Sequence, residues 1–223
     1  MALDFELEIE AVIPKLEGLR SLIVYDSQYV MRILLFRRIL PQFSSKKLYI
    51  AVYTDSMMRR LHITYQSLPE DISALLRKAN VIKVGMHDEV PFGRLYAFMD
   101  VRSDWFGEFV SVLDGLESSS MLIFHGFSLL PLVYGEKAWE HIMEIIDALP
   151  NEITFVNKVS SSLYGDEMKR FMERFHDVVI RVRREEDFLV GNTYWIGVDQ
   201  SITFDVTPGY ARYRIENGEL VRV

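Results

Sequence analysis

The sequence contains no cysteine among its 223 residues. The protein therefore has no disulfide, no thiol nucleophile and no zinc–thiolate site. No apolar run approaches the roughly 18 residues that a membrane-spanning helix needs. The first 19 residues are acidic where a secretory signal peptide would be basic. We therefore expect a cytoplasmic protein with no membrane partner.

An excess of positive charge is also missing. The formal net charge is −7 and the sequence pI is about 5.3, which disfavours a broad nucleic-acid interface and stable binding to anionic lipid. Three basic clusters interrupt this acidity, at Arg37–Arg38, Arg59–Arg60 and Arg181–Arg184. On an acidic protein we expect such clusters to pair with nearby acids rather than to contact nucleic acid.

Glycine is absent between Gly18 and Gly85. Within this interval the stretch "SLIVYDSQYVMRILLFRRIL", residues 21–40, predicts a buried strand that runs directly into a buried helix. In nucleotide-binding α/β proteins such a junction carries a glycine-rich loop, whose backbone N–H groups surround the phosphates. The missing glycines therefore argue against a phosphate-binding loop here.

The individual positions of the phosphate-loop motif also differ. Laying G-x-x-x-x-G-K-[ST] on the junction places Asp26 and Met31 on the glycines, Arg32 on the lysine and Ile33 on the Ser/Thr. Asp26 would set a carboxylate beside the phosphates, and isoleucine cannot hold magnesium. We expect Asp26 or Ser27 to cap the following helix. Weak anion binding at the helix N-terminus is the alternative.

Strand-like and helical patterns alternate along most of the chain. Strands are predicted at residues 21–26, 47–53, 80–84, 121–125, 153–157 and 178–182. Helices are predicted at residues 28–40, 54–61, 70–78, 102–116, 136–149 and 166–174. Several of the strands are continuous apolar runs, as strands covered on both faces require. The sequence therefore predicts an α/β fold with a mainly parallel sheet and helices on both faces.

Both ends of the chain differ from this pattern. Residues 1–18 predict an amphipathic N-terminal helix closed by Gly18, and residues 184–223 are rich in β-formers and turn signals. The Asn217–Gly218 pair favours a tight hairpin. We expect one domain, residues 1–223, that ends in an antiparallel β-hairpin extension.

Four segments resemble the KaiC/RadA branch of the RecA-like ATPases. "LYIAVYTDSMMRRL", residues 48–61, resembles the branch's second strand, but Met57 stands where that branch has a catalytic glutamate. "SSSMLIFHGFS", residues 118–128, resembles the strand with the magnesium-binding aspartate, but His125 occupies its position. "HDVVIRVRR" and "YARYRIENGELVRV" resemble the closing strands. The resemblance covers most of residues 18–223, strand by strand.

The whole pattern resembles an uncharacterised archaeal family, domain of unknown function 257, which has RecA-like organisation and degenerate nucleotide-binding motifs. This resemblance implies a RecA-like (P-loop-NTPase-like) fold and no known activity. With the degenerate motifs, it favours a non-catalytic interaction or regulatory module that has lost the Walker motifs and has no cofactor. The alternative is an enzyme that binds a nucleotide or a small ligand at a remodelled strand-end site.

That alternative rests on polar residues at the ends of the predicted strands. If the RecA-like strand order holds, the carboxyl ends of the strands share one rim, where open α/β sheets bind ligands. The candidate rim residues are Asp26, Ser27, Arg32, Asp55, Ser56, His125, Asn157 and Lys158. They can bind a polar ligand or support acid–base chemistry, or they can be helix caps and ion pairs. No metal site is expected, and "GMHDEV", residues 85–90, is interpreted as a solvated loop.

The last 40 residues also bear on association. Their large apolar side chains are Phe188, Tyr194, Trp195, Ile196, Phe204, Tyr210 and Tyr213. Alternation along a sheet edge can bury only part of such a set, and the remainder would form an apolar patch typical of interfaces. We expect a homodimer, besides a protein partner of unknown identity. In the alternative, the hairpins fold over the sheet and bury all of these side chains.

Overall fold

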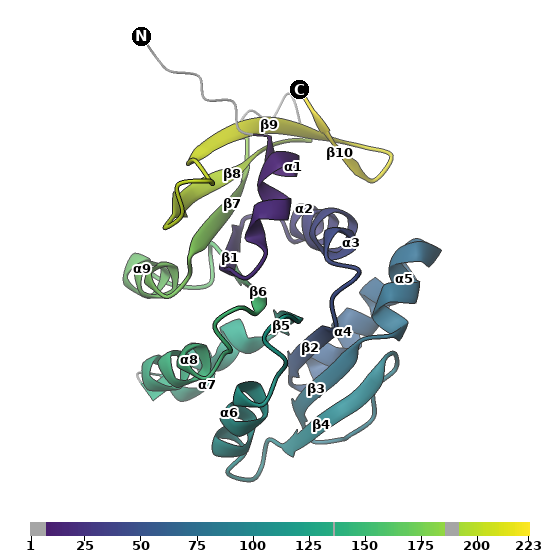
Figure 1. Ribbon diagram of the computed structural model, residues 1–223, viewed down its shortest axis with the longest axis vertical. Helices are drawn as coiled ribbons and strands as arrows, with labels where there is room; N and C mark the ends of the chain where they lie inside the picture. Colours follow the sequence, from purple (N-terminus) through teal and green to yellow (C-terminus); the bar gives the residue numbers. More distant parts are fainter. Residues whose placement is uncertain (1–7, 136, 186–191) are drawn as a thin grey trace. The chain divides into compact units, whose positions relative to one another are not determined.

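The computed structural model describes residues 8–135, 137–185 and 192–223. The chain divides into two compact units (Figure 1). Unit 1 comprises residues 1–43 and 157–223, and unit 2 comprises residues 44–156. The expectation of one domain over residues 1–223 stays a prediction.

Unit 1 contains the first strand and the C-terminal strands. These are β1 (Arg20–Tyr25), β7 (Val178–Arg184), β8 (Thr193–Ser201), β9 (Gly209–Glu216) and β10 (Glu219–Arg222). β1 and β7 are parallel, whereas β7, β8, β9 and β10 pair successively in antiparallel fashion. Asn217 and Gly218 both have positive φ, 52° and 78°, as a tight hairpin turn requires. The antiparallel C-terminal part is therefore confirmed.

The helix after β1 is longer than expected and irregular. It starts as α2 (Gln28–Arg32), continues through the π-helical stretch η2 (Ile33–Ile39) and ends as α3 (Leu40–Gln42). The side chains of Ile33, Leu34, Leu35, Phe36 and Ile39 in the π-helical stretch are buried. Arg37 Nη1 lies 2.7 Å from Glu219 Oε1, so this basic cluster pairs with an acid as expected.

The other helices of unit 1 lie at the N-terminus and before β7. Of the N-terminal helix predicted over residues 1–18, residues 1–7 lie outside the described residues. The described part forms one turn of α1 (Ile9–Val12) followed by the 3₁₀ turn η1 (Ile13–Leu16). Gly18 has φ 68° just after the end of this helical segment, as expected of a glycine that closes a helix. α9 (Asp166–Arg174) has the predicted bounds.

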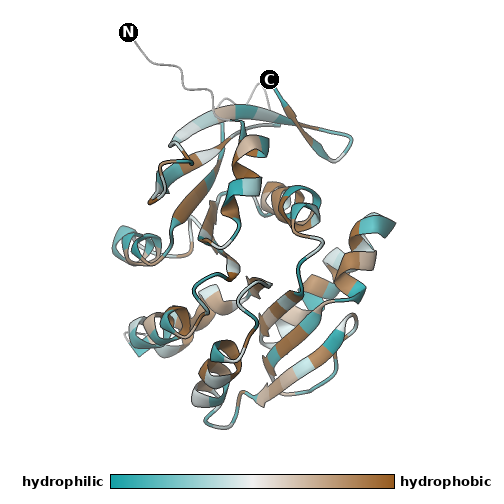
Figure 2. Ribbon diagram, viewed as in Figure 1, coloured by the Kyte–Doolittle hydropathy of each residue, from teal (hydrophilic) through white to brown (hydrophobic). Residues whose placement is uncertain are grey.

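Unit 2 contains the parallel part of the fold. Its strands are β2 (Leu48–Tyr53), β3 (Asn80–Gly85), β4 (Arg94–Asp100), β5 (Met121–His125) and the beginning of β6 (Thr154–Ser160). They are all parallel, in the order β6-β5-β2-β3-β4. Every residue of β2 is buried, and β2 and β3 are largely hydrophobic in Figure 2. The continuous apolar runs are thus strands covered on both faces.

Helices cover both faces of these strands. They are α4 (Asp55–Gln66), α5 (Glu70–Arg77), α6 (Phe106–Asp114), α7 (Leu130–Tyr134), which follows the 3₁₀ turn η3 (Phe127–Leu129), and α8 (Lys137–Asp147). In Figure 1, α4 and α5 lie on one side of β2 and β3, and α6 lies on the other. One core cluster joins Tyr53, Phe109, Phe124 and Ile145 from β2, α6, β5 and α8. The predicted fold class, a mainly parallel sheet flanked by helices, is confirmed.

Strand β4 was not predicted from the sequence. The segment that leads into it forms one wall of the groove described in the next subsection. β3 and β4 are parallel, and such neighbours usually need a helical crossover of a dozen or more residues. Here only residues 86–93 connect them. Phe92 in this connection stacks on Tyr65 of α4, with ring centroids 4.9 Å apart. The connection therefore runs beside α4.

None of the helices within the described residues is both long and apolar enough to cross a membrane.

Candidate functional site

The β1–α2 junction, where the sequence was compared with the phosphate-loop motif, consists of two residues, Asp26 and Ser27. The Asp26 carboxylate accepts hydrogen bonds from the Ser161 hydroxyl and from the Arg184 N–H, the latter at 3.4 Å. Ser27 Oγ accepts the N–H of Val30 at 3.4 Å. Of the two expected caps, Asp26 and Ser27, it is Ser27 that caps the helix. Asp26 instead links the junction to the segment after β6 and to the end of β7.

Three further rim candidates lie in the same unit. Arg32 is the half-buried last residue of α2. Asn157 is buried in β6, and its Oδ1 accepts the N–H of Lys158 at 2.8 Å. Burial lowers the pKa of Lys158 to about 7, because a low-dielectric interior disfavours the charged form. This lysine can therefore lose its proton near neutral pH.

In unit 2, the chain between β2 and α4 is strained. Thr54 has φ 77° and ψ 147°, a region that residues other than glycine occupy at a cost of about 1–3 kcal/mol. Its N–H donates to the Val84 carbonyl at 2.7 Å, and its Oγ1 accepts the N–H of Met57 at 3.3 Å. These bonds hold the strained residue and start α4 at Asp55.

Asp55 forms an ion pair with a buried lysine. Lys83 Nζ lies 2.8 Å from Asp55 Oδ1 and also donates to the Glu89 carbonyl at 2.8 Å. Asp55 Oδ2 accepts the N–H of Met86 at 2.8 Å and lies 3.5 Å from His87 Nδ1. Burial by itself raises the pKa of Asp55, but the bonds from Lys83 and Met86 together with His87 outweigh it, so the pKa lies below its usual value.

Lys83 was not among the residues predicted from the sequence, although a signal was present. The strand reads "NVIKVG", residues 80–85, with one lysine inside an apolar run, and a buried lysine is rare unless paired. Gly85 makes the ion pair possible, since a Cβ there would lie 3.0 Å from Asp55 Oδ1 and 3.2 Å from Lys83 Cε. Glycine therefore leaves the space that the carboxylate and the lysine stem occupy.

The other two candidates in unit 2 have different surroundings. Ser56 is exposed in the first turn of α4. His125 is the half-buried last residue of β5 and pairs in register with Val52 of β2. His87, which was interpreted as part of a solvated loop, is indeed exposed. Among the residues that the structure describes, no three His, Asp or Glu side chains are placed to hold a metal ion.

A groove of about 550 Å³ lies between α4 and residues 89–91, a volume within the usual range for binding sites. We call it the α4 groove. Its lining residues are Asp55, Met58, Arg59, His62, Ile63, Glu89, Val90 and Pro91. Arg59 is exposed, and no described acid forms an ion pair with it. The groove could not be predicted from the sequence, because one of its walls belongs to the unpredicted connection between β3 and β4.

The eight rim candidates thus fall into two sets. Unit 1 contains Asp26, Ser27, Arg32, Asn157 and Lys158, and unit 2 contains Asp55, Ser56 and His125. Within unit 1, Asp26 accepts hydrogen bonds from Ser161 and Arg184 and Ser27 caps the helix. Within unit 2, Asp55 forms an ion pair with Lys83. Their combination into one ligand rim stays a prediction.

The described strands and helices form an α/β fold with a largely parallel sheet and an antiparallel C-terminal part, and solved structures that include a KaiC-like protein share this fold. A structure from the structural study of Project ID PH0250 of Pyrococcus horikoshii OT3 has a TM-score of 0.63 and 16% sequence identity, covering 90% of this chain and 96% of that one. The KaiC-like protein PH0186 of the same hyperthermophilic archaeon has a TM-score of 0.61 and 12% identity, covering 93% of this chain and 90% of that one. At such identity the likeness establishes the fold alone. No family model and no curated protein matches the sequence.

Proposed function

We propose that this RecA-like chain is a non-catalytic interaction or regulatory module that has lost the phosphate-binding loop. The observation that carries the proposal is the β1–α2 junction. Only Asp26 and Ser27 connect the strand to the helix, too few to wrap a phosphate with successive backbone N–H groups. The Asp26 carboxylate held there by Ser161 and Arg184 would repel a phosphate rather than bind it.

The residues after the junction support the same function. A phosphate loop is followed by a lysine and by a Ser/Thr that holds magnesium, whereas this helix continues with the buried Ile33 and Leu34 of its π-helical stretch. The interior of the unit rather than a bound ligand surrounds these side chains. We infer that the chain works by association with proteins, including a second copy of itself. Its archaeal origin and cytoplasmic location stay predictions.

Isothermal titration calorimetry with ATP, with and without magnesium, tests this function. We expect no magnesium-dependent binding in the micromolar range and no ATP hydrolysis above background. A micromolar dissociation constant for magnesium-ATP would contradict the proposal. The variant Asp26→Asn is the matched control, because it removes the charge while keeping the shape. Binding that emerges in this variant alone would confirm that the carboxylate excludes the phosphates.

A second candidate function is binding of a nucleotide or another small polar ligand at a remodelled site. One observation in each unit favours it independently. In unit 2 it is the strain at Thr54, since such strain concentrates at functional sites, and in unit 1 it is the Lys158 pKa of about 7. A thermal-shift screen with ATP, GTP and magnesium separates the two candidates, because a ligand bound only by the folded state raises the melting temperature. A rise that is lost in Lys158→Met would favour this second function.

A further inference from the structure

The connection between β8 and β9 exposes large apolar side chains. Phe204 is fully exposed and Ile202 is 65% exposed. Of the C-terminal apolar side chains considered above, Tyr194, Ile196 and Tyr213 are buried in the sheet, and Phe188 lies outside the described residues. Trp195 of β8 is 37% exposed, but the most exposed apolar side chains of this segment lie in residues 202–205 of the connection, which we call the Phe204 loop.

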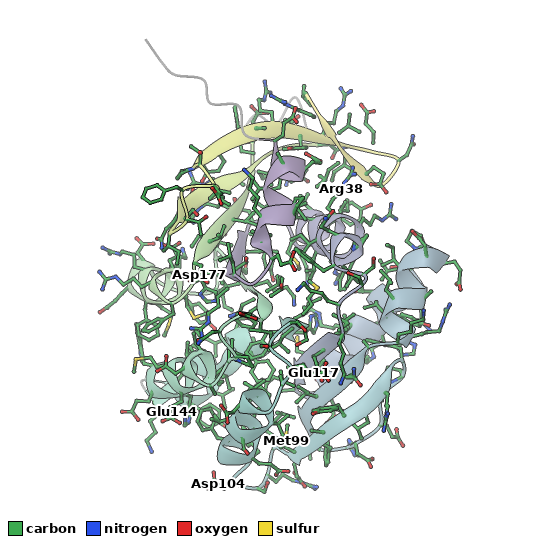
Figure 3. All side chains as sticks on the ribbon, viewed as in Figure 1. Arg38, Met99, Asp104, Glu117, Glu144 and Asp177 are labelled. Carbon is green, nitrogen blue, oxygen red and sulfur yellow. The ribbon has the colours of Figure 1, made fainter. Side chains whose placement is uncertain are left out.

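The Phe204 loop is held by hydrogen bonds on both sides of the phenylalanine. Ser201 Oγ accepts the N–H of Thr203 at 3.1 Å. The Ile202 N–H donates to the carbonyl of Asp177 at 2.9 Å, and Figure 3 labels Asp177. After Phe204, the Asp205 carbonyl accepts from Lys15 Nζ. A loop fixed in this way loses little conformational entropy on binding, so an exposed aromatic side chain on it is suited to anchor a partner.

The α4 groove of unit 2 has the complementary properties. Met58, Ile63, Val90 and Pro91 supply apolar surface within its 550 Å³, which exceeds the volume of one phenyl ring. Arg59 adds an exposed cation at the groove, without an ion pair to any described acid. Asp205, exposed next to Phe204, supplies the matching negative charge. Two acids, Asp55 and Glu89, also line the groove, and Asp55 is already paired with Lys83. The apolar groups and Arg59 of the groove therefore correspond to Phe204 and Asp205 of the loop.

We propose that the occupant of the α4 groove is the Phe204 loop of a second copy of this chain. The Phe204 ring fills the apolar part of the groove, and the Asp205 carboxylate pairs with Arg59. In a two-fold pair each copy gives its loop and receives the other, so the contact is made twice. This inference rests on the proposed function, because it names the surface through which the module associates with itself.

The size of the contact predicts weak association. An aromatic side chain buries about 150–250 Å², so two rings and the groove surfaces that they cover remove roughly 800 Å² from solvent. Stable complexes bury about 1,200–2,000 Å², and smaller interfaces are transient. We therefore expect a reversible dimer with a dissociation constant on the order of tens of micromolar.

Charge-swap complementation tests the proposal on the full chain. Sedimentation velocity from about 1 to 500 μM would measure the dissociation constant of the unsubstituted chain, of Arg59→Glu and of Asp205→Arg. Each variant alone places like charges at both contacts, so we expect at least tenfold weaker dimerisation. Mixing the two variants restores opposite charges at both contacts, and we expect the dissociation constant to return to within about threefold of the original.

Two further variants distinguish this contact from other apolar surfaces. Phe204→Ala should weaken dimerisation at least tenfold while leaving the melting temperature unchanged, since the ring is fully exposed. Trp195→Ala removes a partly exposed aromatic of β8 and should leave the dissociation constant unchanged. A chain that stays monomeric at 500 μM, or variants that do not complement, would overturn the proposal. A persistent monomer or a lack of complementation says nothing about nucleotide binding. Failure of this dimer contact is therefore distinguishable from failure of the proposed function, which the ATP titration tests.

Discussion

Lys83 Nζ lies 2.8 Å from Asp55 Oδ1, with the lysine side chain 3% exposed and the aspartate side chain 34% exposed. This asymmetry matters because removal of the partner of a buried charge costs more than removal of the charge itself. The lysine depends on Asp55 and on the Glu89 carbonyl, whereas Asp55 retains contact with water.

Asp55→Asn should therefore destabilise the protein, and Lys83→Met should change its stability little. We expect Asp55→Asn to lower the free energy of unfolding by about 2–3 kcal/mol. This is at or below the usual cost of breaking a buried ion pair, because Asp55 is partly solvated. Lys83→Met replaces the buried charge by an apolar side chain of similar length and should stay within about 1 kcal/mol. Urea unfolding at pH 7 measures both values, and a larger loss for Lys83→Met would contradict the asymmetry.

The stability of the protein should depend on pH through Lys158. Its folded-state pKa of about 7 lies below the ordinary value of 10.5. Between these pH values the unfolded chain binds more protons than the folded one, so stability rises as pH increases from 7 towards 10.5 and is lost as pH falls. The slope due to this group reaches about 1.4 kcal/mol per pH unit.

Lys158→Met should remove that contribution. We expect the variant to be more stable than the unsubstituted chain near pH 7, and the difference to shrink as pH approaches 10. Lys78→Met, at an exposed lysine, is the matched control and should keep the original pH dependence. Denaturant unfolding at several pH values gives the comparison. An identical slope in Lys158→Met and the unsubstituted chain would contradict the prediction.

Gly126 should not tolerate a side chain. It has φ 90°, and a Cβ there would lie 2.6 Å from Met57 Cγ and 2.7 Å from the Tyr53 carbonyl oxygen. We expect Gly126→Ala to lower the free energy of unfolding by about 2–4 kcal/mol through backbone strain and overpacking. Gly107→Ala in α6 meets no atom within 4 Å and should gain up to about 1 kcal/mol. Thermal unfolding of both variants measures the contrast, which equal melting temperatures would refute.

Thr54 should be replaced more favourably by glycine than by alanine. Alanine removes the hydroxyl that accepts the Met57 N–H and keeps the strained φ of 77°, so we expect a loss of about 1 kcal/mol. Glycine removes the same bond but also relieves strain of about 1–3 kcal/mol. Thr54→Gly should therefore be at least as stable as the unsubstituted chain. Urea unfolding that ranks glycine below alanine would show that the strain is absent.

Local sequence signals predicted the features that neighbouring residues determine. Continuous apolar runs indicated the parallel strands, because a strand covered on both faces needs apolar side chains throughout. Asp26 and Ser27 indicated a helix cap, which Ser27 provides, and the Asn217–Gly218 pair indicated a hairpin turn. In each case the residues that form the feature lie within a few positions of one another, so their types alone carry the information.

Only the tertiary structure decided which distant residues meet. The Asp55–Lys83 ion pair joins the first residue of α4 to the interior of β3, and Lys83 alone gave no sign of its partner. The unpredicted β4 placed Glu89, Val90 and Pro91 beside α4 and so created the groove. Likewise, only folding showed that Phe204 is exposed while Tyr213 is buried. These features depend on strand pairing and packing between segments far apart in the chain, which periodicity and turn chemistry do not encode.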